Sequence, residues 1–334
     1  MGQRFGAAIL GCEGPRLTEA EKRFFSTANP FGFIMFLRNC ETAAQITALC
    51  AELRDSVGWH APVFIDQEGG RVQRLRPPLA RDWVPPLDEV ARSGVKAEAV
   101  MQLRYRIIAA ELLKLGIDGN CAPLLDVARR ETHAVLRNRC YGSDPDGVLR
   151  MGKAVYDGLV AGGVLPVIKH IPGHGRATLD SHLDLPRVSA SRAELEADFA
   201  PFRAFADAPL GMSAHLVFEQ IDPRPATTSP VIIDLIRRDL RFGGLLMTDD
   251  ISMEALDGTV AERGAAALAA GCDVVLHCNG RLNEMQSLLD TVGQMSDPAQ
   301  QRAEAALRAR PQAPTVDIAS LEAEFEALGL DPQI

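Results

Sequence analysis

The sequence predicts an α/β fold, a single-domain (β/α)8 barrel of the TIM type. It contains eight short apolar runs, and many of the intervening stretches place apolar residues three or four positions apart. Nearly continuous apolar strands that alternate with helices indicate a parallel sheet covered on both faces. Eight such units favour closure of the sheet into a barrel. Polar residues also follow most of the runs at the same end, as expected for the rim of a barrel that carries a site.

The predicted strands, in chain order, cover residues 7–10, 31–36, 62–65, 117–127, 163–168, 210–212, 243–247 and 272–276. Helical spacing is found over residues 43–57, 97–115, 151–159, 230–240 and 260–270. A doubly wound open sheet is the structural alternative, and it would need a glycine-rich phosphate-binding turn after the first strand. The sequence there is Gly11-Cys12-Glu13-Gly14-Pro15, which does not match that pattern.

The last part of the chain is predicted to be helical. Residues 281–295 read as a helix that closes the barrel, and two further helices are expected over 297–310 and 318–328, separated by a proline-containing breaker. We therefore expect a catalytic barrel domain over residues 1–295 and a C-terminal helical extension, residues 296–334, packed on it.

Composition narrows the class of protein. The chain has 334 residues, of which 47% are hydrophobic, so it can bury a large core. The formal net charge of -9 argues against a nucleic-acid partner. Seven cysteines without a CxxC pair suit reduced thiols. No apolar run approaches the roughly 18 residues of a membrane helix, and residues 1–6 do not resemble a signal peptide. We expect a cytoplasmic, monomeric protein with no membrane partner.

Polar side chains follow the ends of six consecutive predicted strands. These groups are Asp66, Asp126, Lys169-His170, Ser213-Ala214-His215, Thr248-Asp249-Asp250 and His277-Cys278-Asn279. In a barrel the carboxyl ends of all strands meet on one rim, the face on which active sites are found. The sequence therefore predicts a site at this rim.

Two adjacent carboxylates follow the seventh strand. Asp249 leaves the strand first and is the candidate nucleophile, because its side chain should point toward the rim. Alternation along the strand then turns Asp250 away, and we interpret Asp250 as the N-cap of a helix over residues 251–256 or as support for the site.

The segment after the third strand suits a polar ligand. Asp66 precedes a tight Gly69-Gly70 turn, with Arg71 and Arg74 close by in the sequence. Carboxylates can accept hydrogen bonds from sugar hydroxyls, and arginine suits acyl or carboxylate oxygens. Arg139 alone is ambiguous between a surface residue and a ligand contact, and Asp126 is as readily structural as functional.

The long loop after the fifth strand carries the most chemistry. Lys169 and His170 end the strand, and Asp180 and His182 lie two residues apart, so that an extended backbone points both to one side. A carboxylate beside an imidazole fixes its tautomer and raises its pKa, as an acid/base histidine requires. His170 and His174 have the HxxxH spacing of a zinc pair. Pro172-Gly173 breaks any helix between them, so no metal is expected.

Five segments together resemble one enzyme family. They are DQEGGRVQR (66–74), APLLDV (122–127), KHIPGHG…DSH (169–182), SAHLVF…DPRPA (213–226) and TDDISM (248–253). They are similar to family 3 glycoside hydrolases of the β-N-acetylhexosaminidase type. The likeness runs in register from about residue 5 to about residue 285, and its central motif is long and specific.

The resemblance implies a role for each matching residue. Asp249 matches the catalytic nucleophile, and His182 matches the general acid/base with Asp180 as its partner. Sugar-binding positions are matched by Asp66, Arg74, Arg139, Lys169 and His170. The implied substrate is a small glycan with a β-linked N-acetylglucosamine at its non-reducing end, in particular the muropeptide GlcNAc-1,6-anhydroMurNAc of peptidoglycan recycling. No cofactor and no metal are implied.

The chain departs from the family pattern at two places. Ile171 stands where phenylalanine is usual, and Thr248 where serine is common, but neither is expected to touch a reacting group. Within the family, a β-glucosidase or a phosphorylase remains an alternative. A metal-dependent amidohydrolase would need HxH after the first strand, where this chain has Gly11-Cys12. A sugar-binding protein without turnover is disfavoured by the presence of Asp249, Asp180 and His182.

Overall fold

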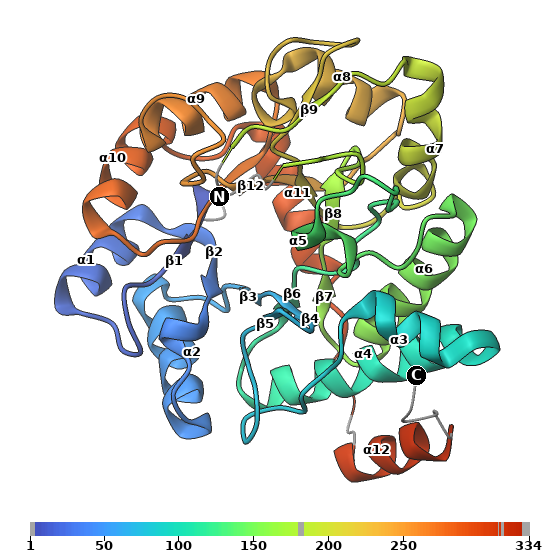
Figure 1. The fold of residues 1–334 in the computed structure, drawn as a ribbon. Helices are drawn as coiled ribbons and strands as arrows, with labels where there is room; N and C mark the ends of the chain where they lie inside the picture. The colour runs from blue at the N-terminus through green and yellow to red at the C-terminus, as the bar shows by residue number, and fades with distance from the viewer. Residues whose placement is uncertain (1–3, 180–183, 313, 315–316, 329–334) are drawn as a thin grey trace.

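The structure is a computed structural model that describes residues 4–179, 184–312, 314 and 317–328. Its centre is a ring of parallel strands, as predicted (Figure 1). The strands are β1 (Gly6–Gly11), β2 (Pro30–Met35), β3 (Val63–Ile65), β6 (Gly119–Asn120), β7 (Leu165–Pro166), β8 (Ile168–Ile171), β10 (Leu210–Ser213), β12 (Leu245–Asp250) and β13 (Val274–His277). The hydrogen-bonded order is β7-β6-β3-β2-β1-β13-β12-β10-β8.

The ring closes through Val167, the residue between β7 and β8. β7 pairs with β6, whereas β8 pairs with β10 on its other side. The Val167 amide donates to the carbonyls of Asn120 and Ala122, at 3.0 Å each. β7 and β8 are therefore two segments of one strand, and the expected α/β barrel of eight strand positions is confirmed. The predicted strand over 117–127 is regular only at β6.

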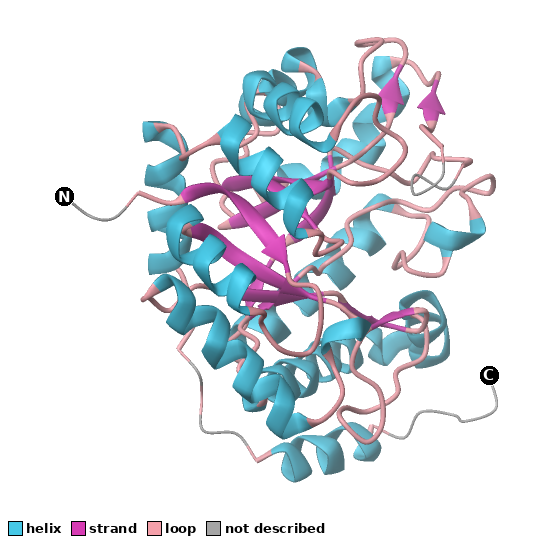
Figure 2. Ribbon diagram, turned by 90° about the vertical axis from the view of Figure 1, so that its left-hand side faces the viewer, coloured by secondary structure: helices cyan, strands magenta, loops and turns pink. Residues whose placement is uncertain are grey.

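Helices surround the ring, as Figure 2 shows in cyan around the magenta strands. Those at predicted positions are α2 (Ala43–Val57), α4 (Ala97–Lys114), α6 (Pro145–Ala161), α8 (Pro230–Arg238), α9 (Val260–Ala270) and α10 (Leu282–Val292). Four other helices of the described chain were not predicted: α1 (Glu19–Ala28), α3 (Pro86–Ser93), α5 (Ala134–Arg137) and α7 (Arg192–Arg203). α1 and α7 begin with capping boxes, Thr18 with Glu21 and Ser191 with Glu194. That sequence signature could have revealed them.

The prediction of a helix over residues 251–256 is wrong. These residues form turns, and the next helix begins only at Val260, after a capping box of Thr259 and Glu262. Arg263 donates to the carbonyls of Ile251 and Met253 at 3.2 and 3.0 Å, so a side chain satisfies groups that a helix would have paired.

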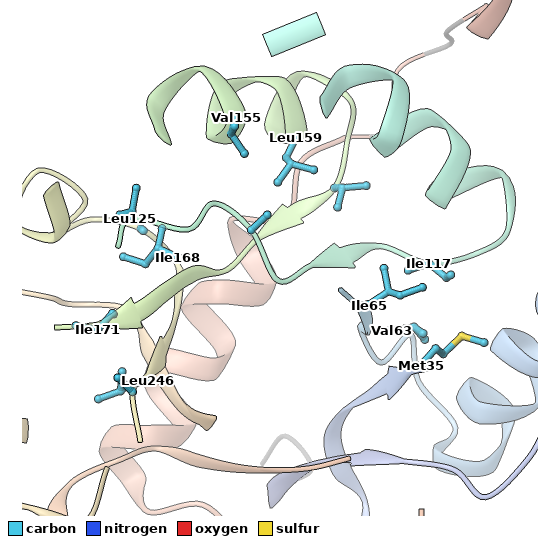
Figure 3. Close-up of a cluster of buried hydrophobic side chains, with 14 of the residues drawn as sticks. Met35, Val63, Ile65, Ile117, Leu125, Val155, Leu159, Ile168, Ile171 and Leu246 are labelled. Carbon is cyan, nitrogen blue, oxygen red and sulfur yellow. The ribbon is translucent and has the colours of Figure 1, made fainter. Parts of the chain in front are cut away.

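Alternation along the strands divides the core into two layers. On β1, Ala7 and Ile9 belong to a cluster inside the ring, whereas Ala8 and Leu10 pack outward against the helices. Figure 3 shows part of the outer layer, where Val155 and Leu159 of α6 approach Leu125 and the strands. The apolar runs are buried on both sides, as a parallel sheet covered by helices requires.

The C-terminal helices pack in two different places. α11 (Asp297–Arg308) buries Ala299, Ala303 and Ala306 against the interior cluster at the amino-terminal end of the strands. α12 (Ile318–Ala327) lies outside the ring, beside α4 (Figure 1). The predicted division at residue 295 stays a prediction. Within the described residues, no helix combines the length and the apolar character needed to cross a bilayer.

Candidate active site

A pocket opens at the carboxyl ends of the strands, with a cavity volume of about 320 Å³. Its apolar floor includes Ile34, Met212 and Leu276, which belong to the cluster inside the ring. The predicted site residues that the structure describes all line it: Asp66, Arg74, Arg139, Lys169, His170 and Asp249. The predicted acid/base pair, Asp180 and His182, lies outside the described residues. The rim predicted from the sequence therefore brings together side chains that are up to 183 positions apart (249 − 66).

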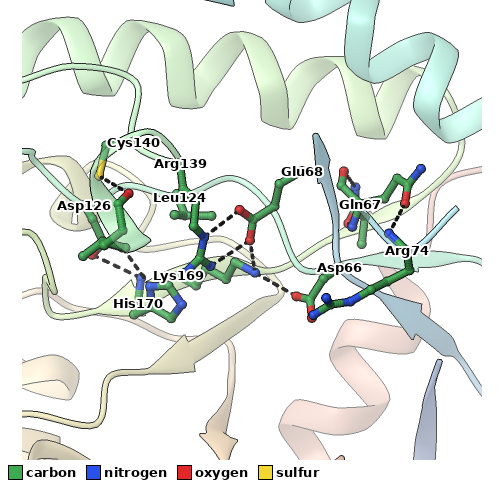
Figure 4. A network of polar contacts seen from close by, with 12 residues as sticks. Asp66, Gln67, Glu68, Arg74, Leu124, Asp126, Arg139, Cys140, Lys169 and His170 are labelled. Carbon is green, nitrogen blue, oxygen red and sulfur yellow. Dashed lines mark hydrogen bonds and ion pairs between the residues drawn. The ribbon is translucent and has the colours of Figure 1, made fainter. Parts of the chain in front are cut away.

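A charged network forms one wall of the pocket (Figure 4). Lys169 Nζ lies 2.9 Å from Asp66 Oδ1 and 2.7 Å from Glu68 Oε1. Arg139 binds Glu68 through both Nε and NH2, at 2.9 Å each. Arg74 donates to Asp66 Oδ2 at 2.9 Å. Three cations thus share two carboxylates, which leaves the network with one excess positive charge facing the cavity.

The network keeps its members ionised although they are wholly or partly buried. Burial by itself would raise the pKa of Asp66, but Lys169 and Arg74 outweigh it and hold that pKa well below its usual range. Burial would lower the pKa of Lys169, yet the carboxylates of Asp66 and Glu68 raise it overall. The pocket therefore presents fixed charges across the neutral pH range, a preorganised surface for hydroxyl groups.

Glu68 is the central member of this network, and sequence reasoning missed it. Only 1% of the residue is exposed, and it bridges Lys169 and Arg139. It lies in the strand β4 (Gln67–Gly69), which pairs with β5 (Val72–Gln73) in a hairpin whose turn residues Gly69 and Gly70 have φ values of 106° and 59°. The signal that could have found it is the spacing of two from Asp66, which places both carboxylates on one side of an extended chain.

His170 is held by a buried carboxylate. Its Nδ1 lies 2.7 Å from Asp126 Oδ2, and the His174 amide donates to Asp126 Oδ1 at 2.6 Å. The sequence did not decide whether Asp126 is structural or functional. Asp126 is fully buried, and its carboxylate orients His170 and the backbone of His174. The Lys169–His170 peptide bond is cis, and both side chains line the pocket.

His174 is a second imidazole in the pocket wall. Its ring centroid lies 5.6 Å from that of His170. Burial, with His170 nearby, lowers the pKa of His174 to about 4, so this ring is neutral at physiological pH. Within the described part of the chain, no three His, Cys, Asp or Glu side chains are grouped to hold a metal ion. The expectation that no metal is used stays a prediction.

Asp249 lies on β12 in the interior register. Leu245 and Met247 belong to the cluster inside the ring and Leu246 to the outer layer, so Asp249 continues the row that points inward. Asp250 also lines the pocket, which alternation did not predict. Its carboxylate accepts from the Ser252 hydroxyl at 2.7 Å and from the Cys278 amide at 3.1 Å, so Asp250 supports the turn after the strand.

The two departures from the family pattern lie away from the cavity. Ile171 is buried in the outer layer, and Thr248 accepts a hydrogen bond from the Leu276 amide at 3.0 Å, joining β12 to β13. Neither side chain lines the pocket. Both substitutions are therefore packing changes.

Comparison with known proteins identifies the family. The model of the glycosyl hydrolase family 3 N-terminal domain matches residues 12–309. The chain belongs to glycoside hydrolase family 3. It is 36% identical over 282 residues, 82% of this chain and 81% of the relative, to the β-hexosaminidase of Alkalilimnicola ehrlichii. The family 3 resemblance inferred from the sequence is thus confirmed.

Solved structures of the family agree with the fold. The crystal structure of native NagZ from Neisseria gonorrhoeae superposes with a TM-score of 0.84 at 31% identity, covering 97% of this chain and 96% of that one. NagZ from the same organism in complex with N-trifluoroacetyl-D-glucosamine gives the same TM-score, identity and coverage. The chain is accordingly a glycoside hydrolase of the β-hexosaminidase type, and its substrate is a small glycan.

Proposed function

We propose that this glycoside hydrolase removes a single β-linked N-acetylglucosamine from the non-reducing end of a small glycan. The observation that carries the proposal is one pocket with an apolar floor, lined by Asp249 and by Asp66, Lys169 and Arg139. Glu68, buried behind this wall, pairs with both Lys169 and Arg139. Such a blind pocket accepts a chain end rather than the middle of a polymer. The related NagZ bound to N-trifluoroacetyl-D-glucosamine supports an N-acylated glucosamine as the sugar.

The proposed substrate is the muropeptide GlcNAc-1,6-anhydroMurNAc, with or without its peptide, in a cytoplasmic step of peptidoglycan recycling. This assignment rests on the similarity to NagZ-type enzymes. The net charge of -9 disfavours nucleic acid as a partner, and we propose that the monomer acts alone. The enzyme needs no cofactor in this scheme.

The proposed reaction is a double displacement that retains the configuration at the anomeric carbon. An oxygen of Asp249 attacks this carbon while the His182 imidazolium gives its proton to the glycosidic oxygen, and the leaving sugar departs as an alcohol. The neutral imidazole then takes a proton from water, whose oxygen attacks the same carbon and releases the Asp249 carboxylate. Asp180 supports the charged form of His182.

The charged network is proposed to bind the sugar hydroxyls in this scheme. Asp66, Arg74, Arg139, Lys169 and His170 fix the ring so that the anomeric carbon faces Asp249. Because the network is already paired and ionised before the sugar arrives, little reorganisation is needed on binding. Retaining glycosidases place the nucleophile and the acid/base about 5 Å apart.

The test compares 4-nitrophenyl β-N-acetylglucosaminide with 4-nitrophenyl β-glucoside, using the wild type and Asp249→Ala. Release of nitrophenol from the acetamido sugar in preference to the glucoside, and loss of turnover in the variant, would support the proposal. A preference for the glucoside would instead indicate a β-glucosidase. Product analysis in excess phosphate separates hydrolysis, which gives free N-acetylglucosamine, from phosphorolysis, which gives the sugar phosphate.

A further inference from the structure

We propose that the C-terminal helix α12 is a positioning element for the sugar-binding network. It would act through Trp83 and Arg104, which hold the β4–β5 hairpin and thereby the carboxylate of Glu68. The inference rests on the proposed function in one respect, because it takes the network of Glu68, Lys169 and Arg139 as the part that binds the sugar.

The first contact in this chain of residues is aromatic. Phe325 of α12 is 4% exposed, and its ring packs edge-on against Trp83, with centroids 5.2 Å apart and an interplanar angle of 82°. The Arg81 guanidinium lies 5.1 Å from the Trp83 ring and 4.9 Å from that of Phe325. α12, which lies beside α4 (Figure 1), therefore packs directly on Trp83 through Phe325.

Trp83 is joined directly to the hairpin by its backbone. Its carbonyl accepts from the Gly70 amide at 2.7 Å, and its amide donates to the side-chain oxygen of Gln73 at 3.1 Å. Gly70 is in the turn and Gln73 is in β5. A displacement of Trp83 must therefore move the turn and β5 of the hairpin or break these two hydrogen bonds.

Arg104 of α4 makes the next connection. The residue is fully buried, its guanidinium lies 5.2 Å from the Trp83 ring, and its NH2 donates to the carbonyl oxygens of Glu68 and Val84 at 2.6 and 2.9 Å. NH1 donates to Glu89 at 3.1 Å. A Cβ on Gly69 would lie only 1.9 Å from Arg104 NH2, so the guanidinium is fitted tightly against the turn.

The carboxylate of Glu68 is at the other end of this connection. The carbonyl oxygen of Glu68 accepts from Arg104 and, at 3.1 Å, from the Tyr105 hydroxyl. The side chain of the same residue binds Arg139 and Lys169. Closely packed groups transmit small displacements, because they have no free space to absorb them. Undocking of α12 should therefore disorder the network, and a ligand that fixes the network should in turn tighten α12, because coupling between sites is reciprocal.

A positioning role and a merely stabilising role differ in what they predict. If α12 only adds buried apolar surface, its loss lowers the melting temperature and leaves KM unchanged in the molecules that remain folded. If α12 positions the hairpin, KM rises at temperatures at which the variant is fully folded. Binding of N-acetylglucosamine would also slow the hydrogen exchange of the backbone amides of α12.

The variant test uses Phe325→Ala in the full chain with Phe205→Ala as its matched control. Phe205 belongs to a comparable aromatic pair with Tyr156, with centroids 5.5 Å apart, in the outer layer and outside the pocket wall. We expect Phe325→Ala to raise KM for 4-nitrophenyl β-N-acetylglucosaminide by roughly 3- to 30-fold, the usual range for such coupling, with a smaller change in kcat. Equal KM values for both variants and the wild type would refute the positioning role.

A second measurement needs no destabilising variant. Hydrogen exchange of residues 318–327 is followed in the wild type with and without saturating N-acetylglucosamine, and slower exchange with the sugar is expected. Trp83 provides a parallel signal, because the chain has two tryptophans and Trp59→Phe leaves Trp83 as the only one, which can be excited selectively. Sugar binding without any change at α12 would overturn this inference alone, whereas failure to bind the sugar at all would refute the proposed function.

Discussion

Replacement of Glu68 by glutamine is the most informative change in the network behind the pocket wall, because it removes one charge and little volume. In the wild type, Glu68 compensates the buried Lys169, at 2.7 Å, and the partly buried Arg139, at 2.9 Å. Without Glu68, Asp66 would be the remaining carboxylate of this network. Removing one partner of a buried ion pair costs about 3–5 kcal/mol, because the remaining charge is left uncompensated. We expect Glu68→Gln to lose about this much unfolding free energy.

The same change should impair binding of the sugar. Lys169 would keep only Asp66 as a charged partner, and Arg139 would lose its bidentate ion pair with a carboxylate. We expect kcat/KM for the aryl N-acetylglucosaminide to fall by roughly 10- to 100-fold, since charge-assisted hydrogen bonds contribute about 1.5–3 kcal/mol each.

Chemical denaturation and steady-state kinetics on the same preparation measure both effects. Asp82→Asn is the control, because Asp82 forms an exposed ion pair with Arg76 on the same segment, and its replacement should change stability by no more than about 0.5 kcal/mol. If Glu68→Gln behaved like this control in both measurements, the network would not organise the pocket as described.

Three further predictions concern single residues. His182→Ala should reduce turnover of substrates with poor leaving groups far more than that of nitrophenyl glycosides, and equal losses on both would argue against an acid role. Asp126→Asn weakens the acceptor of His170 Nδ1, and should lower kcat/KM roughly ten- to a hundredfold, with a smaller effect if His170 is not a sugar contact. Burial raises the pKa of Glu111 from 4.5 to about 7. Between these two pH values the Glu111 carboxyl group therefore keeps its proton in the folded state and loses it in the unfolded state. Unfolding free energy should fall by up to about 3 kcal/mol as pH rises from 4.5 through 7, and urea titrations of Glu111→Gln should lack that slope.

The barrel could be predicted because its buried strands and helices require apolar residues at regular positions in the sequence. Strands such as β2 and β12 lie between an interior cluster and the helices, and both faces must be apolar, which gives continuous apolar runs. Helices with a clear apolar face, such as α2 and α9, were found for the same reason. The short α5 (Ala134–Arg137), which precedes Arg139, has no such period, and this is why Arg139 remained ambiguous from its neighbours alone.

The pocket could be predicted only in part, because its organisation depends on distant contacts. Lys169 and Glu68 are 101 positions apart (169 − 68), and no local sequence pattern predicts that they form an ion pair. Asp250 looked like a helix cap, but its carboxylate is used by Ser252 and by Cys278 of the neighbouring strand end. Trp83 and Phe325 are likewise joined only by the fold. Asp249, by contrast, was placed correctly in the pocket by strand alternation.

The central claim is that Asp249 bonds covalently to the sugar, and one measurement tests it most directly. A fluorinated N-acetylglucosaminide with a good leaving group forms the intermediate faster than water can remove it, and the trapped enzyme is digested and analysed by mass spectrometry. The account predicts one sugar per chain, attached to the peptide that contains Asp249 and to that side chain. A sugar attached to any other residue would contradict it.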